Sequence, residues 1–260
     1  MSSGPAPAGL EGLAQTTDRP LSVREISKSF GGVRALDGCS FGAAPHRITA
    51  LIGPNGSGKT TAFNCISGFY APDGGTIHLG DTPITGWSPS RIVHERLVRT
   101  FQVTRIFRRM TVLENMVVPV RRTRIKAIFW HGIQGHERER AERLLEFVGL
   151  LKFIDEPAGH LSFGQQKLLE LAAALMAEPE IMLLDEPSGG LNPVMIDRLV
   201  GYIRELNGLG TSFVIVEHNM NFVMRLADHV VVLHRGTVIA QGSPADVRAN
   251  PAVLEAYLGN

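Results

Sequence analysis

The chain lacks the features that mark secreted, membrane-spanning or nucleic-acid-binding proteins. It has only two cysteines, Cys39 and Cys65, whose spacing matches no metal-ligand motif, so we expect buried thiols in a reducing compartment. Its longest apolar runs, such as Ile181 to Leu184, are far shorter than the roughly 20 residues of a membrane-spanning helix. The net charge of +1 offers no global field for nucleic acid, so direct nucleic-acid binding is not expected.

The amino terminus also lacks a targeting signal. Residues 1–20 have neither a basic start nor an apolar stretch of signal-peptide length, so export is not expected and a flexible tail is predicted. In the whole chain, 44% of the residues are hydrophobic and 20% are charged, as in ordinary globular proteins. Residues 21–259 show no internal repeat, and we predict that they form a single domain.

Strand patterns occur in two parts of this domain. Residues 21–30 alternate loosely between polar and apolar, and residues 74–84 have the short strands and turn glycines of a β-ribbon. Continuous apolar runs in EIMLLDEP and TSFVIVEH are typical of strands buried on both faces of a parallel sheet. We therefore predict an α/β fold with a mostly parallel sheet and an amino-terminal antiparallel β region.

Helical patterns dominate between these two parts, from about residue 91 to residue 176. In HERERAERLLEFVGLL, one helical face is predicted to carry Leu144, Leu145, Val148 and Leu151. These residues are predicted to form a helical subdomain that is inserted into the α/β core.

A phosphate-binding loop is predicted at residues 53–60, GPNGSGKT, which match G-x-x-x-x-G-K-[ST] between an apolar strand and a helix. The predicted nucleotide-binding residues are Gly53, Pro54, Asn55, Gly56, Ser57, Gly58, Lys59, Thr60 and Thr61. Such glycines let backbone N–H groups converge on phosphate oxygens at a helix N-terminus. Lys59 would reach the β- and γ-phosphates and Thr60 would offer its hydroxyl to Mg²⁺; the alternative is a turn that binds nothing.

Two carboxylates follow the apolar strand of IMLLDEP. Asp185 at its end could hold Mg²⁺ directly or through water, and Glu186 is the candidate general base for water. His218 follows the next buried strand, at the edge where open parallel sheets bind ligands, and could contact the γ-phosphate and orient Glu186. The alternatives are solvated acids and a packed or surface histidine.

A second candidate phosphate loop is LSFGQ, formed by Leu161, Ser162, Phe163, Gly164 and Gln165. Ser162 and Gln165 fit a capping box at a helix start, which leaves Gly164 unexplained. A glycine in the first turn is less favourable for helix formation than alanine by about 1 kcal/mol. We interpret it as room for a phosphate that approaches the helix N-terminus from outside.

The order of these motifs resembles that of the ATPase subunits of ATP-binding cassette (ABC) transporters. The resemblance covers Leu21 to Gly259 and implies the ABC ATPase fold with ATP and Mg²⁺ as ligands. It also implies an adenine-stacking aromatic at Phe30 and a glutamine that senses Mg²⁺ and water at Gln102. Gln102 would act in catalysis with Glu186 and His218, and would help Thr60 and Asp185 at the metal.

The resemblance further implies a dimer in which each LSFGQ segment closes on the ATP held by the other subunit. The loop that would join the two active sites consists of Gly189, Gly190, Leu191 and Asn192. The dimer would be a homodimer or would include a second, different ABC ATPase.

Three segments, RTFQVTRIFRRMTVLENMVV, LDEPSGGLNP and NPAVLEAYLGN, are similar to the branched-chain amino acid group of these transporters. Membership of that group implies a peripheral ATPase at the cytoplasmic face of the membrane. Its partners would be two membrane permeases and an extracytoplasmic solute-binding protein. The ATPase does not touch the cargo, so the transported molecule could be a branched-chain amino acid or a related small solute.

The segment from Arg105 to Lys126 has seven basic residues and a single acid, Glu114. The basic residues are Arg105, Arg108, Arg109, Arg121, Arg122, Arg124 and Lys126. They form either a solvated face or a surface toward the permease and anionic lipid headgroups. Phe129 and Trp130, which follow, could belong to the core or pack against a partner.

Other functions fit the motifs less well. A soluble cassette ATPase that acts on nucleic acid or ribosomes usually has two cassettes or a long coiled coil, and this chain has one phosphate loop and no sustained heptads. A P-loop kinase or GTPase would not explain LSFGQ or His218. Urea, amide or lipopolysaccharide transporters of the same family remain alternatives.

Overall fold

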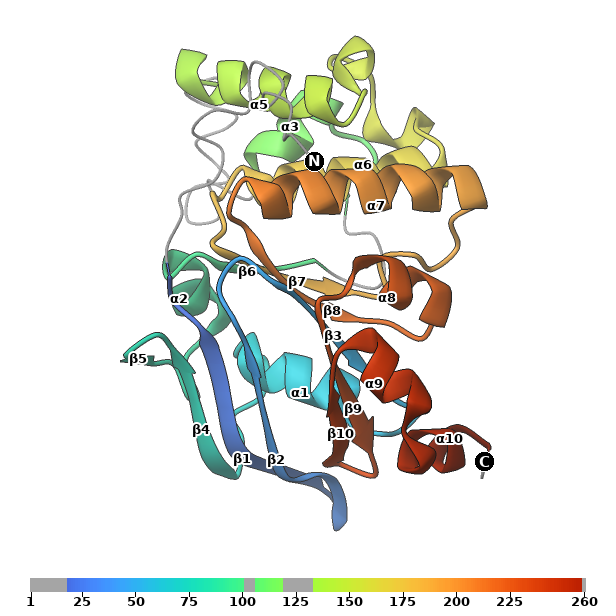
Figure 1. The fold of residues 1–260 in the computed structure, drawn as a ribbon. Coiled ribbons are helices and arrows are strands. Elements are labelled where there is room, and N and C mark those ends of the chain that lie inside the picture. The colour runs from blue at the N-terminus through green and yellow to red at the C-terminus, as the bar shows by residue number, and fades with distance from the viewer. Residues whose placement is uncertain (1–17, 101–105, 119–132, 259–260) are drawn as a thin grey trace.

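The computed structural model describes residues 18–100, 106–118 and 133–258 of the chain. Figure 1 shows two sheets with helices packed around them. Across these ranges, no helix combines the length and the apolar character needed to cross a membrane.

A six-stranded sheet with the order β10-β9-β3-β8-β7-β6 lies at the centre of the fold. Its strands are β3 (Ile48–Ile52), β6 (Leu97–Arg99), β7 (Ile181–Asp185), β8 (Ser212–Val216), β9 (His229–His234) and β10 (Thr237–Gly242). Neighbouring strands are parallel except β9 and β10, which form an antiparallel hairpin. Because β3, β7 and β8 are buried along their whole length, they have the continuous apolar sequences typical of central parallel strands.

A smaller antiparallel sheet with the order β2-β1-β4-β5 packs beside it. Its strands are β1 (Leu21–Phe30), β2 (Val33–Ala43), β4 (Gly74–Leu79) and β5 (Thr82–Pro83). The predicted amino-terminal β region is therefore confirmed. Cys39 and Cys65 are buried in the core that this sheet shares with the larger one, and burial raises the pKa of the two thiols to about 12 and about 11.

Helices cover both faces of the larger sheet. The helices of the described residues are α1 (Lys59–Ile66), α2 (Pro89–His94), α3 (Val112–Val117), α5 (Gly135–Phe147), α6 (Phe163–Leu175), α7 (Pro193–Gly208), α8 (Met220–Leu226), α9 (Pro244–Ala249) and α10 (Pro251–Leu258). Successive side chains of β7 point to opposite faces: Leu183 packs in the core that contains α1, whereas Met182 and Leu184 pack in the core that contains α6 and α7. Thus α1 and α6 lie on opposite faces of the sheet.

The helical region contains α3, α5 and α6 and two short 3₁₀ helices, η1 (Leu151–Phe153) and η2 (Ala158–His160). Leu144, Leu145 and Val148 are buried together, as predicted for one face. Leu151 lies in η1 rather than on that helix, because α5 ends at Phe147 and the chain turns at Gly149, whose φ is 72°. The range 91–176 also includes β6, which pairs with β7 in the larger sheet.

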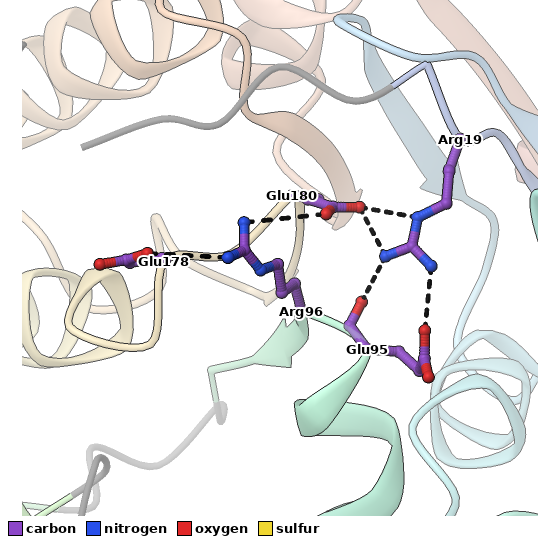
Figure 2. A network of polar contacts seen from close by, with 5 residues as sticks. All are labelled: Arg19, Glu95, Arg96, Glu178 and Glu180. Atoms are coloured by element: carbon purple, nitrogen blue, oxygen red, sulfur yellow. Dashed lines mark hydrogen bonds and ion pairs between the residues drawn. The ribbon is translucent and has the colours of Figure 1, made fainter. Parts of the chain in front are cut away.

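A network of ion pairs lies where β6 and β7 begin (Figure 2). We call it the amino-edge network; it consists of Arg19, Glu95, Arg96, Glu178 and Glu180. The Arg19 guanidinium donates to Glu180 Oε2 at 2.7 and 2.9 Å and to Glu95 Oε2 at 2.9 Å, and Arg96 lies 3.8 Å from Glu178 and 3.9 Å from Glu180. Arg19, which sequence analysis assigned to the tail, is therefore held by the folded domain; residues 1–17 lie outside the described residues.

Candidate functional site

The loop of residues 53–58 leads from the buried strand β3 into α1. Gly53 has a φ of 152° and Gly58 has a φ of 105°, and a Cβ atom would lie 2.1 Å from Leu233 O at Gly53 and 2.6 Å from Ala35 O at Gly58. Larger residues would therefore clash with backbone at both positions. Gly58 is the N-cap of α1 and has no side-chain cap, so the first N–H groups of the helix face outward without a capping oxygen.

Lys59 folds back over this loop. Its Nζ donates hydrogen bonds to the carbonyl oxygens of Gly53 and Pro54, each at 2.8 Å. Burial lowers the pKa of the Lys59 ammonium, and the negative charges of Glu186 and Asp185 oppose that shift. The cation is thus held against the carbonyl groups of the glycine loop and interacts electrostatically with the two acids.

The order of strands brings the predicted site residues to one edge of the sheet. The strand β8 lies between β3 and β7, so the loop at residue 53, His218 and Asp185 all lie at the carboxyl ends of adjacent parallel strands. Glu186 Oε1 lies 3.7 Å from His218 Nδ1. The Glu186 backbone has a φ of 47° and its N–H donates to Val216 O at 2.9 Å, which anchors this residue to the end of β8.

Arg99, at the end of β6, is a site residue that the sequence did not predict. Its guanidinium donates to Asp185 Oδ2 at 2.7 Å, and it also donates to Asn64 Oδ1 at 2.7 Å and Ser67 Oγ at 2.9 Å. Asn64 belongs to α1 and Ser67 is its C-cap, so Arg99 connects Asp185 to the helix that follows the phosphate loop. A basic residue at the end of the apolar strand in LVRTFQ was the available signal.

Glu217, the residue that follows β8, was likewise not predicted from the sequence. Its side chain is completely buried and accepts hydrogen bonds from backbone N–H groups of Ser188, His218 and Asn219. An acid between an apolar strand and a histidine gave a weak signal, since nothing in the sequence indicates its partners near position 188.

The LSFGQ segment starts α6 with the predicted capping box. Ser162 Oγ accepts from Gln165 N at 3.4 Å, and Gln165 Oε1 accepts from Ser162 N at 2.8 Å. The structure also gives Gly164 a packing role that the sequence did not reveal. A Cβ atom at Gly164 would lie 3.0 Å from two side-chain atoms of Met195 in α7, so glycine allows α6 and α7 to approach closely.

The loop of residues 189–192 packs against this helix start within the same chain. Gly190 has a φ of 74°, and a Cβ atom there would lie 2.8 Å from the ring of Phe163. Asn192 is the N-cap of α7, and its Oδ1 accepts a hydrogen bond from Met195 N at 2.9 Å. The LSFGQ segment and the 189–192 loop therefore form one continuous surface.

The remaining predicted residues are placed as follows. Phe30 is partly exposed and packs edge to face with Tyr70, at a ring distance of 5.2 Å. Gln102 lies outside the described residues, as do Arg105, residues 121–126, Phe129 and Trp130. Arg108 and Arg109 are exposed. The structure does not bring LSFGQ to the phosphate loop of the same chain, because α6 and α1 are on opposite faces of the sheet (Figure 1).

The residues present fit a nucleotide. An uncapped helix N-terminus, a glycine loop that side chains would block, and a lysine beside it form a donor set for phosphate oxygens. In the described part of the chain, no group of three or more His, Cys, Asp or Glu side chains gathers into a metal cage. One carboxylate and one hydroxyl, from Asp185 and Thr60, suit Mg²⁺ that takes its other ligands from phosphates and water.

Comparison with known proteins identifies relatives of this chain. A family model for the ABC transporter matches residues 36–189, and a model for the branched-chain amino acid ATP-binding cassette transporter matches residues 237–260. The high-affinity branched-chain amino acid transport ATP-binding protein LivG of Escherichia coli (strain K12) is 41% identical over 249 residues, which cover 92% of this chain and 97% of the relative. BraF of Pseudomonas aeruginosa, described in the same words, is 40% identical with the same coverage.

Solved structures agree with these sequence relatives. The crystal structure of the ADP conformation of MJ1267, an ATP-binding cassette of an ABC transporter, has a TM-score of 0.86 and 35% sequence identity. It covers 94% of this chain and 100% of that protein. The fold predicted from the motifs is therefore confirmed.

Proposed function

The chain belongs to the ABC transporter family and is one of its ATP-hydrolysing subunits, and from that we propose that it powers uptake of branched-chain amino acids or a related small solute. The observation that carries the proposal is the match of 92% of the chain to LivG. The match of residues 237–260 to the model for the branched-chain amino acid group supports it independently.

The nucleotide would bind at the carboxyl edge of the larger sheet. Residues 53–58 and the first turn of α1 would bind the phosphates through backbone N–H groups, and Lys59 would contact the β- and γ-phosphates. Phe30 would stack on adenine. Mg²⁺ held by Thr60, Asp185 and Gln102 would neutralise developing charge on the phosphates.

Glu186 and His218 would act on the water that attacks the γ-phosphate. Glu186 would orient and deprotonate this water, and its 3.7 Å separation from His218 Nδ1 supports a role for His218 in orienting the carboxylate. Gln102 would contact the same water and the metal. Arg99 would keep Asp185 close to α1, because it binds both.

We also propose that two ABC subunits, identical or different, complete two sites between them. The helix that LSFGQ starts and the helix that follows the phosphate loop lie on opposite faces of the larger sheet, which supports the use of LSFGQ toward a partner. Ser162 and the N-terminus of α6 would bind the γ-phosphate held by that partner, and residues 189–192 would lie at the contact. Hydrolysis would then separate the subunits.

The complex would include two permeases and an extracytoplasmic solute-binding protein, with this chain peripheral at the cytoplasmic face of the membrane. The basic segment at residues 105–126 would lie toward the permease or the lipid headgroups. No feature of the described residues favours a function on nucleic acid or ribosomes.

The proposal is tested with the chain purified together with its genomic neighbours and reconstituted in vesicles. We expect ATP hydrolysis to increase several-fold when the solute-binding protein is loaded with leucine, isoleucine or valine. If urea or an amide stimulated hydrolysis instead, the transported solute would be that compound rather than a branched-chain amino acid. Failure of the chain to co-purify with a permease would contradict a transport function.

A further inference from the structure

Glu217 is a buried carboxylate at the end of β8 that no part of the proposed chemistry uses. Its exposed fraction is 0%. Burying an ion without compensation is costly, so buried carboxylates need strong hydrogen-bond donors. Among the residues that the structure describes, the donors are backbone N–H groups rather than cationic side chains in hydrogen-bond contact. His218 Nδ1 lies 3.9 Å away.

The two oxygens of Glu217 bind two different loops. Oε1 accepts from Ser188 N at 2.9 Å, and Ser188 lies two residues after Glu186 in the loop that follows β7. Oε2 accepts from His218 N at 2.9 Å and from Asn219 N at 3.0 Å, in the loop that follows β8. One carboxylate therefore joins the two loops that contain the proposed catalytic pair.

Both loops are also held on their other sides. The Glu186 N–H donates to Val216 O, and Asn219 Oδ1 caps α8 through Phe222 N at 3.2 Å. The Glu217 side chain links these two anchored segments, so its hydrogen bonds restrain the position of Glu186 relative to His218. From this geometry we infer that Glu217 is a positioning residue for hydrolysis, which holds Glu186 and His218 in register through the backbone of Ser188, His218 and Asn219.

The inference rests on the proposed roles of Glu186 and His218. It also goes beyond them, because it assigns the relative placement of Glu186 and His218 to a third residue whose side chain is completely buried. A glutamine at position 217 distinguishes the hydrogen bond to Ser188 from the hydrogen bonds to His218 and Asn219. An amide has one acceptor oxygen, which can serve His218 and Asn219 together; its NH₂ group would then face the Ser188 N–H, donor against donor. Glu217→Gln should therefore release the Ser188 loop and keep the other.

The test compares the wild-type chain, Glu217→Gln and a matched control, Glu180→Gln. Glu180 is also a buried glutamate, with a 7% exposed side chain, but it belongs to the amino-edge network. We expect Glu217→Gln to lower kcat for MgATP about 10- to 100-fold, because small misplacements of reacting groups have effects of this size. The KM and the Kd for MgATP should change less than about two-fold, and Glu180→Gln should keep the wild-type kcat.

Amide hydrogen exchange adds a readout that a purely structural role would not produce. In folded Glu217→Gln, the Ser188 amide should exchange faster while the His218 and Asn219 amides keep their protection. An unchanged kcat, or equal losses of kcat, nucleotide affinity and protection throughout the chain, would overturn the inference. If the variant does not fold, amide hydrogen exchange in the wild-type chain tests the inference. The amides of Ser188, His218 and Asn219 should then exchange through one cooperative opening event. Independent opening of the Ser188 amide would contradict the inference.

Glu186→Gln separates this inference from the proposed function. If that variant hydrolyses MgATP at the wild-type rate, the proposed role of Glu186 is wrong. If it is inactive while Glu217→Gln keeps the wild-type kcat, only the inference about Glu217 is wrong.

Discussion

Strands β6 and β7 have an arginine–carboxylate pair at each end, and the two ends differ in what surrounds the pair. At the amino end, Arg96 and Glu180 precede the strands and lie 3.9 Å apart, with Arg19 donating two hydrogen bonds to the same glutamate. At the carboxyl end, Arg99 and Asp185 are the last residues of the strands and lie 2.7 Å apart.

The amino end is closed by protein groups. Arg19 joins Glu180 to the side chain and the carbonyl of Glu95, and Arg140 of α5 lies 3.1 Å from Glu178, so segments distant in sequence are held together (Figure 2). At the carboxyl end Arg99 and Asp185 are themselves buried, with side chains 7% and 5% exposed, and two proposed site residues near them are accessible to solvent. The side chain of Glu186 is 26% exposed and that of His218 is 60% exposed.

The same residue types therefore join distant segments at one end of the sheet and lie beside the proposed nucleotide site at the other. The physical reason lies in the connections: loops after the carboxyl ends of parallel strands diverge and form a crevice, where helix N-termini also point. Substitutions at the carboxyl end should therefore lower the rate of ATP hydrolysis, whereas substitutions at the amino end should lower the free energy of unfolding.

The largest effect is expected for Glu186→Gln at the carboxyl end. Steady-state ATP hydrolysis should fall about 100-fold or more, since general-base assistance contributes on this order. Binding of ATP should persist, because the phosphate loop is untouched. Hydrolysis rates and nucleotide affinity measured on the same preparation check this prediction. Turnover at the wild-type rate would show that Glu186 is not the general base.

The next effect concerns Ser162→Arg, which tests whether one chain holds a complete site. Hydrolysis should fall about 10-fold or more, whereas the affinity of the monomer for ATP should stay unchanged. Ser243→Arg is the matched control, because Ser243 caps α9 in a capping box of the same kind and removing either cap costs about 1 kcal/mol. A large loss of monomer affinity in Ser162→Arg would contradict the use of this segment toward a partner.

A smaller effect, on stability alone, is expected for Arg19→Ala at the amino end. Glu180 would lose its two shortest hydrogen bonds, and the free energy of unfolding should decrease by about 1–2 kcal/mol, given the partial exposure of Arg19. Urea unfolding of the full chain measures this change. The hydrolysis rate per folded molecule should match that of the wild type; a rate loss would mean that the two ends are coupled.

The smallest effect is expected for Arg138→Gln. Arg138 forms an exposed pair with Glu142 on α5, with 2.8 Å between Nε and Oε1. Its removal should change the free energy of unfolding by less than about 0.5 kcal/mol, because solvent screens such pairs. The same urea unfolding experiment measures this change. A decrease as large as that of Arg19→Ala would show that the amino-edge network stabilises the fold no more than an exposed ion pair does.

The sequence by itself determined the secondary-structure elements, including the glycine loop between β3 and α1. Continuous apolar strands, turn glycines and the capping box at Ser162 are local patterns, and local patterns follow from propensities and spacing. The antiparallel region, the parallel core and the helical insertion were predictable for this reason. So was the edge that contains residue 53, Asp185 and His218, because the carboxyl ends of parallel strands meet.

Only the tertiary structure decided which residues hold that edge in place. Ser188 and Glu217 are 29 positions apart, and Gly164 meets Met195 across two helices, so no spacing rule connects them. Arg19 is tied to Glu180 from a segment that reads as a tail, because ion pairing depends on packing rather than on periodicity. Such contacts form only after the sheet has brought distant segments together.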